Sequence, residues 1–409
     1  MLYSILIFEL TLLVVIIYKY GIISPVSLGY IVFFIYGQSF LIDYILFDIS
    51  ILNISGFQNL HINSLSYEYI TLTYLLFFLG FSFFPLLSKK IRYVKIEEKY
   101  FYTNIFKDNL VLIACIVFLV IYLYTTKDFS RYSKIDWLQS HKLITFILNI
   151  CGYIWIIIIL RKQDSCKLTY LFTILFISLA FFDGGRELIV FFVLSILFLK
   201  FERTNSFYII LIGILLLVLM LIWKKFFVFI ILGGFNITLF FDSVSNQLIS
   251  FSNSDPKASL FLISSYFNSS HNEFYQNFGF TYIENVVGQF LRTFKIIEYP
   301  SLGEKTANYF LNIDEKGKGL AFSGILESML NFYYAGPFIL GLTLGFLTRK
   351  IVDLKLVDSY KYRVLSLFMI IVIFKLVRTE LAVVLKVYIL PMLIAYYFIF
   401  KNSYKLNEK

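Results

Sequence analysis

Apolar runs of about 20 residues recur along most of the chain, and this repetition most constrains how the chain can fold. A helix needs roughly 20 apolar residues to cross the hydrocarbon core of a bilayer. About eleven runs approach that length: 2–18, 26–47, 69–87, 110–126, 143–160, 168–182, 188–199, 207–223, 325–347, 364–377 and 381–400. A twelfth run, 226–241, is interrupted by two glycines and an asparagine, and it fits a surface-lying helix equally well. Backbone polar groups inside lipid must bond within their own helix, so the pattern predicts an all-α polytopic membrane protein with about 11 or 12 transmembrane helices.

The composition excludes soluble folds. Of 409 residues, 59% are hydrophobic and 15% are charged, whereas soluble proteins carry about 25% charged residues. The net charge of +10 is explained by loop residues that set the topology, so we expect no nucleic-acid partner. Three cysteines offer no disulfide framework for an exported loop.

Lysine and arginine in short loops set the orientation, because they concentrate on the cytoplasmic side. With eleven spans, the basic segments 89–107, 161–167, 349–363 and 401–409 all fall on one side, which we assign to the cytoplasm. Segment 48–68 has no lysine or arginine and falls outside. The N-terminus is then outside, or inside if a twelfth crossing exists.

One loop is much longer than the others and divides the chain. Residues 224–323 have a polar, soluble-like composition with dense aromatics, and they fall on the outer side. We expect short amphipathic helices there, lying against the membrane. This predicts N-terminal transmembrane helices over 1–223, a large outer loop over 224–323 and C-terminal transmembrane helices over 324–409.

The loop sequence Asp-Gly-Gly-Arg-Glu at 183–187 is the first candidate for chemistry. The backbone amides around Gly185 and the guanidinium of Arg186 suit a phosphate or pyrophosphate. The alternative is an arginine that anchors the loop among lipid headgroups.

Charges interrupt the apolar pattern again near residue 378. Lys375 and Arg378 are three residues apart, so they project from one side of a helix at the predicted outer face. Charges there are costly without partners, which favours a functional role over snorkelling to the interface.

The segment 324–345 carries the best candidate base. Glu327 and Asn331 share one helix face, and a partly desolvated carboxylate there would have a raised pKa. The alternative is a polar pair that packs two helices together. Gly341 and Gly345 form a GxxxG pattern, which more often indicates close helix packing than catalysis.

The outer loop adds Arg292 and Lys295 as candidate binding residues, although a charge run is usually a solvated surface. The three histidines are scattered without a ligand motif, so we expect no metal site and no cofactor.

Taken together, these segments resemble the O-antigen polymerase (Wzy) family, which joins oligosaccharide repeat units of bacterial surface polysaccharide. The resemblance lies in Gly184-Gly185-Arg186, the large outer loop, the stretch PSLGEKTANYF at 300–310 and LESMLNFYYAGPFILGLTLG at 326–345. Leu326 stands where the family usually has a small residue, and the glycine expected soon after Asn331-Phe332 is delayed to Gly336.

The resemblance implies a GT-C-type glycosyltransferase in the bacterial inner membrane with a periplasmic active site. A growing glycan on undecaprenyl pyrophosphate would be the donor, a lipid-linked repeat unit the acceptor, and a chain-length regulator a further partner. Arg186, Arg378 and Arg292 would neutralise the pyrophosphate, Glu327 would be the base with His271 in reserve, and Tyr282 would stack on sugars. An O-antigen ligase, which moves glycan to lipid A core, and a lipid-linked oligosaccharide flippase are the alternatives.

Overall fold

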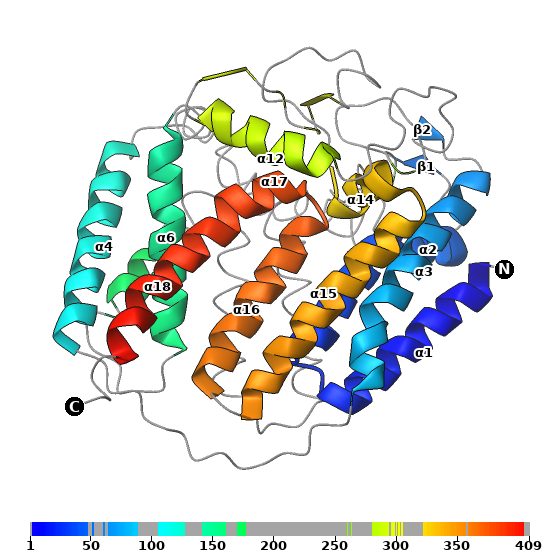
Figure 1. Ribbon diagram of the computed structural model, residues 1–409, viewed down its shortest axis with the longest axis horizontal. Coiled ribbons are helices and arrows are strands. Elements are labelled where there is room, and N and C mark those ends of the chain that lie inside the picture. The colour runs from blue at the N-terminus through cyan, green and yellow to red at the C-terminus, as the bar shows by residue number, and fades with distance from the viewer. Residues whose placement is uncertain are drawn as a thin grey trace, which may run out of the picture. The chain divides into compact units, whose positions relative to one another are not determined.

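The protein is almost entirely helical in the part of the chain that the structure describes (Figure 1). The computed structural model describes residues 2–47, 51–52, 60–61, 64–88, 105–126, 141–160, 169, 171–176, 260, 263, 280–293, 296–298, 300, 302, 304–305, 322–356 and 359–404. The α-helices are α1 (Leu2–Tyr20), α2 (Pro25–Phe47), α3 (Ser64–Leu87), α4 (Ile105–Thr126), α6 (Lys142–Ile159), α12 (Phe280–Thr293), α14 (Gly324–Phe332), α15 (Ala335–Asp353), α16 (Ser359–Leu376), α17 (Leu381–Val383) and α18 (Leu390–Tyr404). A 3-10 turn, η3 (Leu354–Leu356), and a π-helical turn, η4 (Val384–Ile389), complete the helices, and β1 (Ile51–Leu52) pairs antiparallel with β2 (Leu60–His61).

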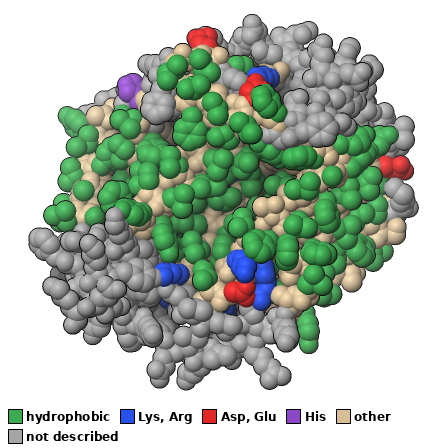
Figure 2. All heavy atoms as spheres, in the orientation of Figure 1, with side chains coloured by type: hydrophobic (Ala, Val, Ile, Leu, Met, Phe, Trp, Pro, Cys, Tyr) green, Lys and Arg blue, Asp and Glu red, His purple; other side chains and the backbone are tan. Residues whose placement is uncertain are grey.

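Five helical segments among the described residues are long and apolar enough to cross a membrane: Leu2–Tyr20, Tyr67–Leu87, Asn109–Thr126, Ala335–Asp353 and Leu381–Ile399. Their outward sides carry exposed large apolar residues such as Val14, Ile121 and Leu393. Figure 2 shows such hydrophobic side chains over much of the face in view. The prediction of an α-helical membrane protein is confirmed.

The chain divides into two compact units, each drawn from several parts of the sequence. The first comprises Met1–Tyr93, Phe241–Asp353 and Met369–Leu385, and the second comprises Val94–Phe240, Leu354–Phe368 and Lys386–Lys409. The predicted boundaries at residues 223 and 323 stay a prediction.

In the first unit, α3 and α15 pack backbone to backbone. A Cβ at Gly341 would lie 2.2 Å from the Phe77 carbonyl oxygen, and one at Gly80 would lie 2.2 Å from that of Phe338. Gly345 faces the Phe81 carbonyl oxygen equally closely. The two helices therefore run parallel with glycine at their contact, and the packing role predicted for Gly341 and Gly345 is confirmed.

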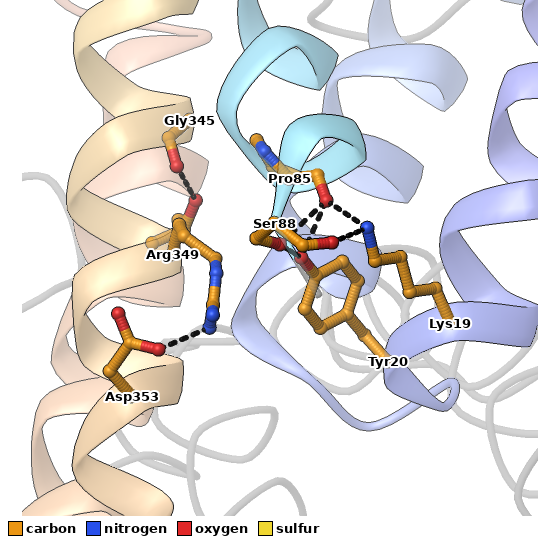
Figure 3. A network of polar contacts seen from close by, with 8 residues as sticks. Lys19, Tyr20, Pro85, Ser88, Gly345, Arg349 and Asp353 are labelled. Atoms are coloured by element: carbon orange, nitrogen blue, oxygen red, sulfur yellow. Dashed lines mark hydrogen bonds and ion pairs between the residues drawn. The ribbon is translucent and has the colours of Figure 1, made fainter. Parts of the chain in front are cut away.

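Hydrogen bonds join the C-terminal ends of α1 and α3, and the C-terminal part of α15 lies beside Tyr20 (Figure 3). The Lys19 ammonium donates 2.8 Å hydrogen bonds to the carbonyl oxygens of Pro85 and Leu86, at the end of α3. A lysine in this position stabilises the free carbonyls and the negative end of the helix dipole. Arg349 lies 5.9 Å from the Tyr20 ring centre and pairs with Asp353 at 2.6 Å.

The second unit is built around α6 and α18. The Tyr360 hydroxyl donates to the Ile157 carbonyl oxygen at 2.8 Å, and the Asn149 amide donates to that of Val387 at 3.1 Å. Val387 lies in the π-helical turn η4, where the ordinary helical bonding is interrupted.

Candidate functional site

Buried polar side chains gather in the first unit, where α12, α14 and the turn between α16 and α17 meet. We call this the Glu327 site and define it as Asn285, Leu302, Glu327, Glu380 and Leu381. Each of these residues makes a hydrogen bond to another member. The site lies at the N-terminal end of α15, whereas Arg349 lies near its C-terminal end. A 19-residue helix spans about 28 Å, so the two polar regions are separated by nearly the length of a membrane span.

The site depends on a break in the chain that the sequence did not predict. Segment 325–347 was expected to be one span, but α14 ends at Phe332 and α15 begins at Ala335. Tyr333 has φ +51°, a left-handed conformation that is uncommon for a bulky residue. At Gly336 a Cβ would lie 1.9 Å from the Ser328 carbonyl oxygen, so the two helices cross closely. The break places Glu327 on its own short helix, outside the membrane-spanning α15.

Local capping fixes the start of that short helix. The Ser323 hydroxyl accepts a 3.2 Å hydrogen bond from the Leu326 N–H, as expected for an N-cap serine. The Asn331 amide donates to the Glu327 carbonyl oxygen at 2.8 Å. Asn331 is fully buried, and its predicted place on one face with Glu327 is confirmed.

The carboxylate of Glu327 is completely enclosed, with 0% of the residue exposed. Its Oε2 accepts a 2.7 Å hydrogen bond from the Leu381 N–H, and its Oε1 accepts one of 3.4 Å from the Asn285 amide. Leu381 is the first residue of α17. Glu327 therefore holds the turn 377–380 that joins α16 to α17.

Burial raises the pKa of Glu327 from 4.5 to about 8. The Leu381 N–H opposes this rise, because it stabilises the charged form, and the neighbouring Glu380 carboxylate adds to it by repulsion. Glu327 consequently holds its proton at neutral pH in the larger part of the molecules.

Glu380, in the same turn, accepts a second buried hydrogen bond. Its Oε2 accepts a 2.7 Å hydrogen bond from the Leu302 N–H, and the residue is 3% exposed. Leu302 is thereby fixed to the turn between α16 and α17. Two buried carboxylates thus join three segments that are distant in sequence.

Arg292, at the end of α12, forms a bidentate ion pair with Glu304, twelve residues later in the chain. Its Nη1 and Nη2 lie 2.7 Å and 3.2 Å from the two carboxylate oxygens. This pairing raises the pKa of Arg292, and the charge of Glu380 acts in the same direction. The guanidinium fork suits this carboxylate and would suit a phosphate equally well.

The other two predicted cations lie at the end of α16 and on the turn that follows it. Lys375 is buried near the end of α16, and its carbonyl oxygen accepts hydrogen bonds from the N–H groups of Arg378 and Thr379 at 2.9 Å and 2.8 Å. Arg378 is half-buried, three residues before the Leu381 amide that Glu327 holds. Tyr282 lies within electrostatic range of Glu327, and burial is the main cause of its raised pKa.

Tyr282 lies within electrostatic range of Glu327, Asn331 lies one turn further along the same helix, and Arg292 lies within electrostatic range of Glu380. Lys375 lies in the last turn of α16, and Arg378 lies on the turn that follows it. Gly185, Arg186, His271 and Lys295 lie outside the described residues. Sequence reasoning missed Asn285, although a signal existed: Thr281, Asn285, Gln289 and Arg292 form a polar stripe along one side of α12. Among the residues that the structure describes, no group of three or more His, Cys, Asp or Glu side chains is placed to hold a metal ion.

The arrangement fixes the turn 377–380, which carries Arg378, through the buried carboxyl groups of Glu327 and Glu380. As placed, the Glu327 carboxyl positions that turn and is too enclosed to contact a substrate. Comparisons with protein-family models, curated proteins and solved structures gave no match.

Proposed function

We propose that this membrane protein polymerises lipid-linked oligosaccharide repeat units at the outer face of the bacterial inner membrane. The observation that carries the proposal is the turn 377–380, which bears Arg378 and is held by the buried carboxyls of Glu327 and Glu380. A cation at the end of a membrane helix, on a turn fixed by buried bonds, suits the diphosphate of a membrane-anchored donor.

The orientation supports an outer location for the Glu327 site. Lys19, Arg349 and Lys350 mark the opposite ends of α1 and α15, and basic residues concentrate on the cytoplasmic side. The parallel course of α3 and α15 agrees with the crossing directions that the eleven-span topology assigns to them. The Glu327 site is then periplasmic, within the GT-C-like architecture that the resemblance implies.

In the proposed reaction, a hydroxyl oxygen of the acceptor sugar bonds to the anomeric carbon of the donor glycan. The bond from that carbon to the pyrophosphate oxygen breaks, and undecaprenyl pyrophosphate leaves with the electron pair. The hydroxyl O–H bond breaks as well, and its proton passes to the departing pyrophosphate. Arg378, with Arg186 and Arg292, would stabilise the developing negative charge. The base role predicted for Glu327 requires its carboxylate to become accessible when the acceptor binds, so the geometry favours a positioning role.

Surface glycan from cells tests the proposal. We expect a deletion strain, and cells carrying Arg378→Ala or Arg186→Ala at normal protein levels, to attach single repeat units in place of a ladder of long chains. Lys350→Ala is the matched control, because Lys350 is an exposed cation at the other end of α15, and it should keep the ladder. Wild-type chain lengths in both arginine variants would overturn the assignment. Loss of all surface glycan, single units included, would indicate a ligase or a flippase instead.

A further inference from the structure

Helix α12 is amphipathic, but its polar side faces the protein interior and its apolar side is exposed, which is the opposite of a surface helix on a water-soluble protein. Its polar residues Thr281, Asn285 and Gln289 are 6%, 0% and 3% exposed. Its apolar residues Phe280, Ile283 and Val287 are 62%, 63% and 50% exposed. In water the opposite arrangement would have the lower free energy. Exposing apolar side chains to water costs free energy, and buried polar groups need hydrogen-bond partners inside the protein. The medium that this outer stripe meets must therefore be apolar.

The place of α12 in the first unit indicates which apolar medium it meets. The helix packs on α14 and α17, and α17 begins the membrane-spanning segment Leu381–Ile399. Figure 1 shows α12 running crosswise to α15, at the end of the unit where α14 and α17 lie. Helix α12 thus lies against the first residues of a helical segment that is long and apolar enough to cross a membrane.

The charges of α12 lie where a membrane surface would place them. Glu284 borders the apolar stripe and pairs with Lys305 at 3.5 Å, with both side chains more than a third exposed. Arg292 lies at the C-terminal end of the helix. Just beyond it, Ile296 and Ile297 are 65% and 41% exposed and add to the apolar surface.

We infer that α12 is an interfacial membrane helix, with Phe280, Ile283 and Val287 in contact with the acyl chains of the outer leaflet. Its apolar side lies in the bilayer, and its polar side covers the Glu327 site through the Asn285 amide. The Glu327 site then lies at headgroup depth, beside lipid. This inference rests on burial and packing, takes its leaflet from the orientation argued above, and is independent of the proposed reaction.

Depth-resolved quenching in lipid nanodiscs tests the inference. Ile283→Cys and Val287→Cys, each labelled with an environment-sensitive fluorophore, report on the apolar stripe. Glu284→Cys is the matched control on the polar border. Both apolar positions are exposed, so the substitutions leave the packing of α12 intact. The parent protein, in which Cys115 and Cys151 are buried, supplies the background labelling.

We expect lipids with a nitroxide on the acyl chain to quench the labels at 283 and 287 about twofold more than the label at 284, because the apolar face of such a helix is buried among acyl chains. Aqueous iodide should show the reverse order. Equal iodide quenching at all three positions, without acyl-chain quenching, would overturn the inference by placing the stripe in water. Protection from both quenchers, with energy transfer between differently labelled copies, would overturn it in favour of a protein contact.

Discussion

The backbone N–H of Leu381 donates a 2.7 Å hydrogen bond to Oε2 of Glu327, which lies 54 residues earlier in the chain. This contact joins a short helix that precedes one membrane span to the first residue of another. Because the bond is fully buried on the carboxyl side, losing it would leave an amide or a carboxyl without a partner, at a cost of about 1–3 kcal/mol.

Glu327→Gln and Glu327→Ala distinguish positioning from proton transfer. Glutamine keeps an oxygen for the Leu381 N–H, and its own N–H can donate to the Asn285 carbonyl oxygen, which has no other partner among the described residues. We expect Glu327→Gln to keep most of the polymer ladder and Glu327→Ala to lose it, measured on gels of surface glycan at matched protein levels. Loss of the ladder in both variants would instead support the predicted base role.

Stability should fall as pH rises through the range set by Glu327. Its pKa is about 8 in the folded protein and 4.5 ordinarily, so between these values the folded state holds a proton that the unfolded chain has released. The free energy of unfolding then decreases with pH, by at most about 1.4 kcal/mol per pH unit for this group. Thermal unfolding in detergent at about pH 6 and about pH 9 should show a larger drop for the wild type than for Glu327→Gln. An equal drop in both proteins would show that other groups carry the effect.

The ion pair between Arg292 and Glu304 allows a charge-exchange test. If the pair only fixes the outer loop, Arg292→Glu combined with Glu304→Arg should restore what either single change loses. If Arg292 also binds the diphosphate, the double variant should recover thermal stability but not polymer length, because the cation has moved. We expect the second result. Recovery of long chains by the double variant would restrict Arg292 to a structural role.

The contact between α3 and α15 should not tolerate a larger side chain. Gly341→Leu forces a side chain against the Phe77 carbonyl oxygen, and overpacking of this kind costs about 1–3 kcal/mol. We expect a lower unfolding temperature and a smaller monodisperse fraction on size-exclusion chromatography. Thr343→Leu is the matched control, because Thr343 is an exposed position of the same helix. Equal behaviour of the two variants would contradict the close packing.

Length and apolar composition, which act locally, predict the five helical segments among the described residues that could cross a membrane, and the total of about 11 or 12 spans stays a prediction. Glycine spacing in 341–345 likewise predicts a helix contact, since small residues are needed wherever backbones approach closely. The same reasoning missed the break at Tyr333-Tyr334. Neither tyrosine is a helix breaker, and the only local signal is Gly336-Pro337 in the first turn of α15, where proline is tolerated.

The hydrogen bonds that hold the Glu327 site together could not be predicted from local sequence patterns. Glu327 accepts from the Leu381 N–H, and Glu380 accepts from the Leu302 N–H, 78 residues earlier in the chain, so each bond depends on tertiary packing. Every residue except proline has a backbone N–H, so the sequence does not indicate which N–H groups will bond to these carboxyl groups. The polar stripe of α12 was visible in the sequence, but an amphipathic helix is expected to turn such a stripe outward. The interfacial position that we infer for α12 reverses that expectation.

Reconstitution of the purified protein tests the central claim most directly. The protein in liposomes would be given a single lipid-linked repeat unit as both donor and acceptor, with no other enzyme present. We predict a ladder of longer lipid-linked glycans, with one undecaprenyl pyrophosphate released for each unit added and no ladder from Arg378→Ala. Repeat units that stay single in the presence of folded wild-type protein would contradict the account.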